Sequence, residues 1–99
     1  MLFRRDPQQR RERHLVDIRA DLAEARQDLA VAEEQFLVVD ASADEAQLQM
    51  VLEESVLSAR NNDDALRHAQ LMRRQMELAR SRVAELEHAE AEMLRDMPG

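Results

Sequence analysis

The sequence predicts an all-α protein in which two long helices fold back on each other as an antiparallel coiled-coil hairpin. Three observations favour this class. The 99 residues contain one glycine, at position 99, and two prolines, at positions 7 and 98, so no strong helix breaker lies between the ends. The good helix formers Ala, Leu, Glu, Arg and Gln dominate the composition. Apolar residues recur at alternating spacings of three and four, which is the period of a left-handed coiled coil.

The first helix is expected to begin at Pro7 and to end near residue 53. Asp6 can cap this helix, and a proline suits the first helical position because its missing N–H would have no partner there. Residues 1–6 form a short extension in this interpretation, and residues 7–97 form a single hairpin domain. The predicted seam of the first helix, which faces the second, consists of Leu15, Ile18, Leu22, Ala25, Leu29, Ala32, Phe36, Val39, Ala43, Ala46 and Met50.

The second helix is expected to span about 57–97. Arg95 falls in its last turn, where a cation interacts favourably with the helix dipole. Glu90 is the one charged residue in its pattern, and it is expected to reach water or Arg19. The predicted seam of the second helix consists of Ala65, Ala69, Met72, Met76, Ala79, Val83, Leu86, Glu90, Met93 and Met97.

Three positions for the turn between the helices are compatible with local sequence. One is near residue 41, where Ser42 and Glu45 could form a capping box. The second is near residue 55. The third is near residue 61, within a run of Asn and Asp residues that favour turns.

The distribution of charge favours the turn near residue 55. Residues 27–59 carry eight acidic side chains and no basic one, whereas residues 60–82 carry six arginines and three acids. A turn near 55 places these two blocks side by side, and a turn near 41 would place acidic residues against each other. Flanking charges of this kind select the orientation of paired helices.

Many apolar residues fall outside the seam and crowd the half of the hairpin near the turn. We expect a second copy, in a homodimeric four-helix bundle, or another protein to cover them. These off-seam residues are Val31, Leu37, Val38, Leu48, Val51, Leu52, Val56, Leu57, Leu66, Leu71, Leu78 and Leu94. The residues expected to mediate self-association or partner binding are Leu48, Leu52, Val56, Leu57 and Leu66.

The pattern favours a small non-enzymatic protein–protein interaction module, such as an adaptor, scaffold or assembly component. No cysteine, glycine-rich phosphate loop or Ser/His/Asp set is present, so we expect no catalytic residue, cofactor or metal. One alternative is a metal-binding, ferritin-like bundle that uses Glu85, His88 and Glu90 across subunits. The first two of these residues have the Glu-x-x-His spacing of di-iron bundles.

A second alternative is a transcription or nucleic-acid-associated regulator with an acidic hairpin tip. Glu53 and Glu54 would lie at the tip, with Asp63 and Asp64 close by. In this feature the chain resembles the factors that enter the secondary channel of RNA polymerase, although those factors also carry a globular domain. Direct binding of nucleic acid is not expected, because the net charge is −7 and only two residues are aromatic.

The sequence contains no apolar run approaching the roughly 20 residues that span a membrane, and no signal peptide. We therefore expect a cytoplasmic protein. The basic residues are all arginines, and with the abundant alanine this is typical of a GC-rich bacterial genome. Leu2 and Phe3, followed by two arginines, are the candidates for a peripheral contact with a membrane surface or a partner.

Overall fold

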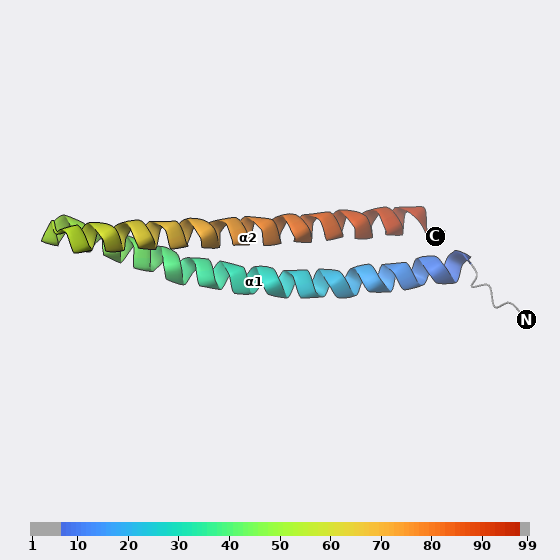
Figure 1. Ribbon diagram of the computed structural model, residues 1–99. Helices are drawn as coiled ribbons and strands as arrows, with labels where there is room; N and C mark the ends of the chain where they lie inside the picture. Colours follow the sequence, from blue (N-terminus) through green and yellow to red (C-terminus); the bar gives the residue numbers. More distant parts are fainter. Residues whose placement is uncertain (1–6, 98–99) are drawn as a thin grey trace, which may run out of the picture.

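The computed structural model describes residues 7–97, which form two antiparallel α-helices joined by a tight turn (Figure 1). Helix α1 spans Pro7–Glu53 and helix α2 spans Val56–Asp96. The predicted all-α helical hairpin is confirmed, and each bound lies within one residue of the expected position. The expected cap at Asp6 and the candidate contact residues Leu2 and Phe3 lie outside the described residues.

The molecule is a thin rod of 76 × 29 × 13 Å. Its radius of gyration is 22.1 Å, whereas a compact domain of this length would have about 13 Å. A rod two helices wide cannot enclose a thick core, so each helix can bury only the stripe that faces its neighbour. The rest of each helix surface is open to solvent.

The turn consists of Glu54 and Ser55. Glu54 has a φ of 47°, in the left-handed region, and its N–H donates to the Met50 carbonyl at 2.9 Å to complete the last turn of α1. Ser55 is extended and caps α2. Its Oγ accepts from the Ser58 N–H at 3.0 Å, and its own N–H donates to the Ser58 Oγ at 3.1 Å. This capping box starts α2 directly after the left-handed residue, so the chain reverses without a glycine.

The alternative turn positions near residues 41 and 61 are wrong. Ser42 lies inside α1, where its hydroxyl donates to the Val38 carbonyl at 3.2 Å instead of capping a helix. Asn61 and Asn62 lie inside α2, which has already begun at the Ser55 cap. The physical reason is that local turn propensity is weaker than tertiary packing. The seam residues before and after each of these positions pack against the other helix, and this packing keeps both segments helical.

The seam side chains are buried or half-buried along both helices. The best packed cluster lies in the half away from the turn, where Leu22 and Ala25 of α1 meet Val83 of α2, with Leu29 and Leu86 beside them. Leu22 is 2% exposed. Large aliphatic side chains therefore hold the open end of the hairpin together.

Toward the turn, the fully buried inward positions become small or polar, whereas Met50 in the same region is only half-buried. Ala43 and Ala69 are buried there, and α2 continues the seam through Ser58 and Asn62, which are also buried. These two residues extend the seam beyond Ala65, where it was expected to begin. They were missed because a search for apolar periodicity passes over Ser and Asn.

Candidate interaction surface

The turn half of the hairpin, defined as residues 31–78, exposes most of the large apolar side chains. Of the thirteen exposed within residues 7–97, eleven lie in the turn half, and the other two are Val16 and Leu94. The buried inward positions of this half are Ala43, Ser58, Asn62, Ala69 and Met76. The turn half is therefore apolar on its outside as well as along part of its seam.

The five residues expected to mediate association are all exposed. Their exposed fractions are 60% for Leu48, 74% for Leu52, 80% for Val56, 67% for Leu57 and 41% for Leu66. They do not form one patch, because they project from different sides of the two helices.

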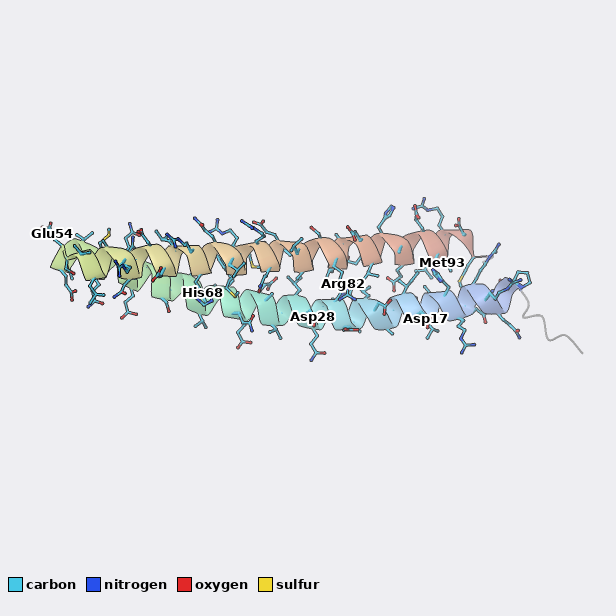
Figure 2. All side chains as sticks on the ribbon, viewed as in Figure 1. Asp17, Asp28, Glu54, His68, Arg82 and Met93 are labelled. Carbon is cyan, nitrogen blue, oxygen red and sulfur yellow. The ribbon has the colours of Figure 1, made fainter. Side chains whose placement is uncertain are left out.

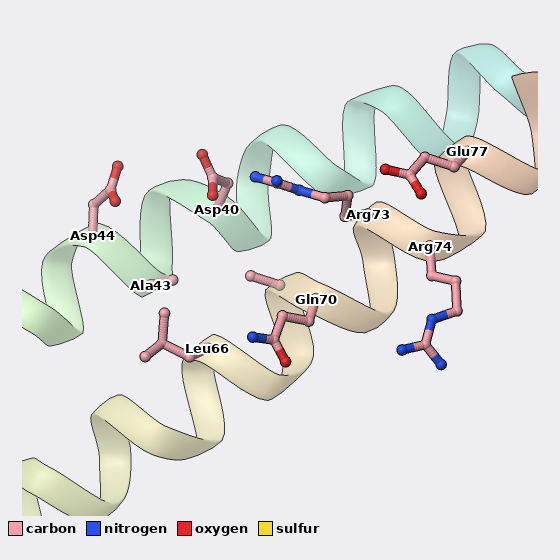
Figure 3. Close-up of a pocket in the computed structure, with 9 residues that line it drawn as sticks. Asp40, Ala43, Asp44, Leu66, Gln70, Arg73, Arg74 and Glu77 are labelled. Atoms are coloured by element: carbon pink, nitrogen blue, oxygen red, sulfur yellow. The ribbon is translucent and has the colours of Figure 1, made fainter.

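One broad face is charged. The groove on this face is lined by residues of both helices: Asp40, Ala43, Asp44, Leu66, Ala69, Gln70, Arg73, Arg74 and Glu77 (Figure 3). The Arg73 guanidinium lies 5.4 Å from the centre of the Phe36 ring. Arg80 and Glu33 form an ion pair at 3.8 Å. Leu66 thus lies in a groove whose other lining residues include two aspartates, two arginines and a glutamate.

The opposite broad face, here called the apolar face, carries neutral side chains along its midline. One groove on it is lined by Val31, Gln35, Val38 and His68, among others. A second groove, nearer the turn, is lined by residues that include Ser42, Glu45, Gln49, Leu57 and Asn61. Residues seven positions apart lie on the same side of a helix, so Leu52, Leu71 and Leu78 extend this face.

The narrow edge of α2 differs from both faces. A shallow groove there is lined by Val56, Ala59, Arg60, Asp63, Asp64 and Arg67. Val56 therefore lies beside arginines, whereas Leu52 and Leu57 belong to the apolar face. Leu48 is on α1, four residues before Leu52 and thus one helical turn away from it.

The residues of the alternative, metal-binding interpretation do not form a metal site within one chain. Glu90 pairs with Arg19, its carboxylate Oε2 lying 3.1 Å from the arginine Nε. His88 pairs with Glu92 at 3.1 Å along α2. No group of three or more His, Asp or Glu side chains among residues 7–97 is arranged to hold a metal ion.

The acidic tip residues are exposed at the turn. Glu54 lies at the extreme end of the rod (Figure 2). Glu53 accepts a hydrogen bond from Gln49 at 3.0 Å, within the same helix. Asp63 and Asp64 lie two turns into α2, on its edge groove. The acids therefore occupy two separate places, one at the tip and one along the side of the rod.

Neither helix, over the part of the chain that the structure describes, has an apolar stretch sufficient to cross a membrane. No family model, curated protein or solved structure matches the chain. The distribution of apolar and charged side chains over the hairpin is therefore the observation from which a function has to be inferred.

Proposed function

We propose that this protein is a non-enzymatic helical interaction module that self-associates through the exposed apolar side chains of its turn half. The observation that carries the proposal is the number of large apolar side chains that this half exposes. Eleven large aliphatic side chains there point to solvent, in addition to the apolar side chains that its seam buries. Large exposed apolar surface on a small protein is typical of an interaction site.

The total surface supports the same conclusion. The accessible area is 7879 Å², whereas a compact chain of 11.5 kDa would expose about 5800 Å². Part of the excess follows from the rod shape. The excess of about 2100 Å² is nevertheless larger than the roughly 800 Å² that a standard protein–protein interface removes from each partner. Association is the direct way for a two-helix rod to cover its second apolar stripe.

The arrangement suits a scaffold or assembly component. The start of α1 and the end of α2 lie together at the open end (Figure 1). Most of the exposed large apolar residues belong to the turn half. A module built in this way can associate at one end and present other contacts at the other. Burial of apolar area would supply the driving force at about 25 cal/mol per Å².

The test is the mass of the protein in solution, measured by sedimentation equilibrium and light scattering over a range of concentrations. We expect the unmodified chain to have at least twice the 11.5 kDa monomer mass. Leu52→Asp combined with Leu57→Asp should reduce the mass to that of the monomer and leave the helix content by circular dichroism unchanged. Aspartates at both positions would have to be buried without partners in the assembly.

The matched control is Val16→Asp combined with Leu94→Asp. These residues are 64% and 46% exposed, but they lie at the open end of the rod. The control should keep the mass of the unmodified protein. A monomeric unmodified chain, or an equal loss of mass in both double variants, would overturn the proposal.

A further inference from the structure

We infer that the apolar face is the docking site for a second copy of this chain, stacked face to face with its tip pointing in the opposite direction. The inference rests on the proposed self-association and assigns its surface and its orientation. The two stacked turn halves would form a four-helix bundle in which every neighbouring pair of helices is antiparallel.

The alignment of the two helices on this face is given by an ion pair. The Arg82 Nη1 donates to Asp28 Oδ2 at 3.4 Å across the hairpin (Figure 2). Counting seven residues at a time toward the turn from this pair places Gln35 beside Gln75, Ser42 beside His68 and Gln49 beside Asn61. The grooves agree with this alignment, because Gln35 and His68 line one of them and Gln49 and Asn61 line the other.

Two rows of larger side chains flank this neutral midline. They run Val31, Val38, Glu45, Leu52 on α1 and Leu57, Asp64, Leu71, Leu78 on α2, with a spacing of seven in each. Asp64 lies at the border of this face, because it also lines the groove on the edge of α2. Across the hairpin the two rows pair into four rungs: Leu52 with Leu57, Glu45 with Asp64, Val38 with Leu71, and Val31 with Leu78. Three rungs are apolar and one is acidic.

The area of these rungs fits a second copy. The six apolar side chains are between 47% and 74% exposed, which amounts to roughly 600 Å² of apolar surface on each chain. A standard interface removes about 800 Å² from each partner, and the neutral midline residues supply the remainder. No arginine lines the two grooves of this face, so two such faces meet without unpaired arginines; the charged residues that line the grooves are Glu34, Glu45 and Glu53.

The acidic rung decides the orientation. If two copies stacked with their tips together, Glu45 and Asp64 of one copy would meet the same two acids of the other. Such like-charge contacts are costly at an interface. With the tips opposed, the two-fold axis passes near Ser42 and His68, and the acidic rung of one copy meets the Val38 and Leu71 rung of the other. His68 of each copy then lies near the acidic rung of the other.

The other surfaces fit a second copy less well. The charged face already contains the Arg80–Glu33 pair and the Arg73–Phe36 contact, which stacking would have to desolvate. The edge of α2 presents Arg60 and Arg67 beside Asp63 and Asp64. Only the apolar face combines large aliphatic side chains with a midline that lacks charge.

The choice of face is tested with two adjacent residues of α1. Val38 is 64% exposed on the apolar face, and Leu37, which is 67% exposed, points to the other side of the same helix. We expect Val38→Asp to raise the dissociation constant about 100-fold or more, and Leu37→Asp to change it less than about threefold. The dissociation constant is measured by sedimentation, with circular dichroism to verify that both variants remain helical.

Reversed effects of these two variants would overturn the assignment of the face. The proposed self-association would still stand in that case, provided that the Leu52→Asp, Leu57→Asp variant dissociates. The two conclusions therefore fail separately. A chain that stays monomeric at all concentrations would overturn both of them and would leave a different protein as the occupant of the apolar face.

The orientation is tested by disulfide trapping, because the natural chain contains no cysteine. Ser42→Cys should form a disulfide-linked dimer with itself under mild oxidation, since it lies near the two-fold axis. Leu52→Cys and Val31→Cys chains with tags of different size should form a mixed dimer when combined. A Leu52→Cys chain mixed with a Leu57→Cys chain should form no mixed dimer. Stacking with the tips together would instead bring these two cysteines close to each other. The antiparallel arrangement would be overturned if the Leu52→Cys and Leu57→Cys chains formed a mixed dimer and the Leu52→Cys and Val31→Cys chains did not.

Discussion

Arg19 donates its Nε–H to Oε2 of Glu90 at 3.1 Å, joining the two helices near the open end although 71 residues separate them in sequence. Glu90 occupies a seam position of α2, but its side chain is 26% exposed because the carboxylate reaches the edge of the seam. The arginine side chain is 54% exposed. The pair therefore has partial access to water and resembles a surface ion pair more than a buried one.

Removing each partner of this pair should have opposite effects. Glu90→Leu should raise the free energy of unfolding by about 1 kcal/mol, since an apolar side chain would replace a partly desolvated carboxylate beside Leu86 and Met93. Arg19→Ala should lower it by about 0.5–1 kcal/mol, because the carboxylate loses its cation. Urea unfolding at one fixed protein concentration measures both. A loss of more than 1 kcal/mol in Glu90→Leu would contradict this account of the pair.

Replacing Asn62 should stabilise the hairpin. Asn62 is 6% exposed, and its Oδ1 has no hydrogen-bond partner. A buried acceptor without a partner costs about 1–3 kcal/mol, and alanine is also the better helix former. We therefore expect Asn62→Ala to raise the free energy of unfolding by about 1–2 kcal/mol, as measured by urea unfolding.

The neighbouring Asn61 provides the control for this substitution. It is exposed, so Asn61→Ala should gain only the difference in helix propensity, about 0.5 kcal/mol. Equal gains in the two variants would indicate that helix propensity alone is responsible. A destabilised Asn62→Ala variant would show that the amide has a structural role that its contacts do not reveal.

Glu54→Gly should also stabilise the protein. A non-glycine residue with a φ of 47° pays a steric cost of about 1–2 kcal/mol, which glycine avoids. Glycine gains more freedom in the unfolded chain, so the net increase should be about 0.5–1 kcal/mol in thermal or urea unfolding. The adjacent Glu53→Gly, at the last residue of α1, should instead lower stability by a similar amount. The prediction is wrong if both variants lose stability.

Ser55→Ala should destabilise the start of α2. The substitution removes the Oγ that accepts from the Ser58 N–H and leaves that part-buried group unpaired. We expect a loss of about 1–2 kcal/mol in unfolding free energy. Ser42→Ala is the control, because that hydroxyl bonds only a carbonyl within α1, and its removal should change stability by less than about 0.5 kcal/mol. Equal losses would argue against a special role for the cap.

The helices and their fold-back point could be predicted from sequence because two independent patterns agree. The spacing of Leu22, Leu29 and Phe36 specifies one inward stripe, and the acidic and arginine-rich blocks favour the turn near 55 over the one near 41. The turn chemistry could not be predicted. Glu54 adopts a conformation usual for glycine, and the Ser55 cap uses a serine at the third helical position where Glu or Gln is typical.

The apolar residues outside the seam could also be recognised from sequence, but their arrangement could not. Leu52, Leu57 and Leu66 look equivalent in a list of off-seam residues. Only the pairing of α1 with α2 shows that Leu66 lies on a charged groove and that Leu57 lies on a groove of the apolar face. Which side of the rod a residue occupies depends on the register between helices, and a single-helix pattern does not contain that register.

The shared location of the two helix ends has a further consequence. Pro7 and Asp96 lie at the end of the rod farthest from the turn (Figure 1). A fluorophore or fusion partner attached there would stay roughly 60 Å from the tip of its own chain, at 1.5 Å for each helical residue. Two copies with opposed tips would hold their attachments at opposite extremities. The assembly would then act as a strut of set length, and energy transfer between terminal labels would measure its span.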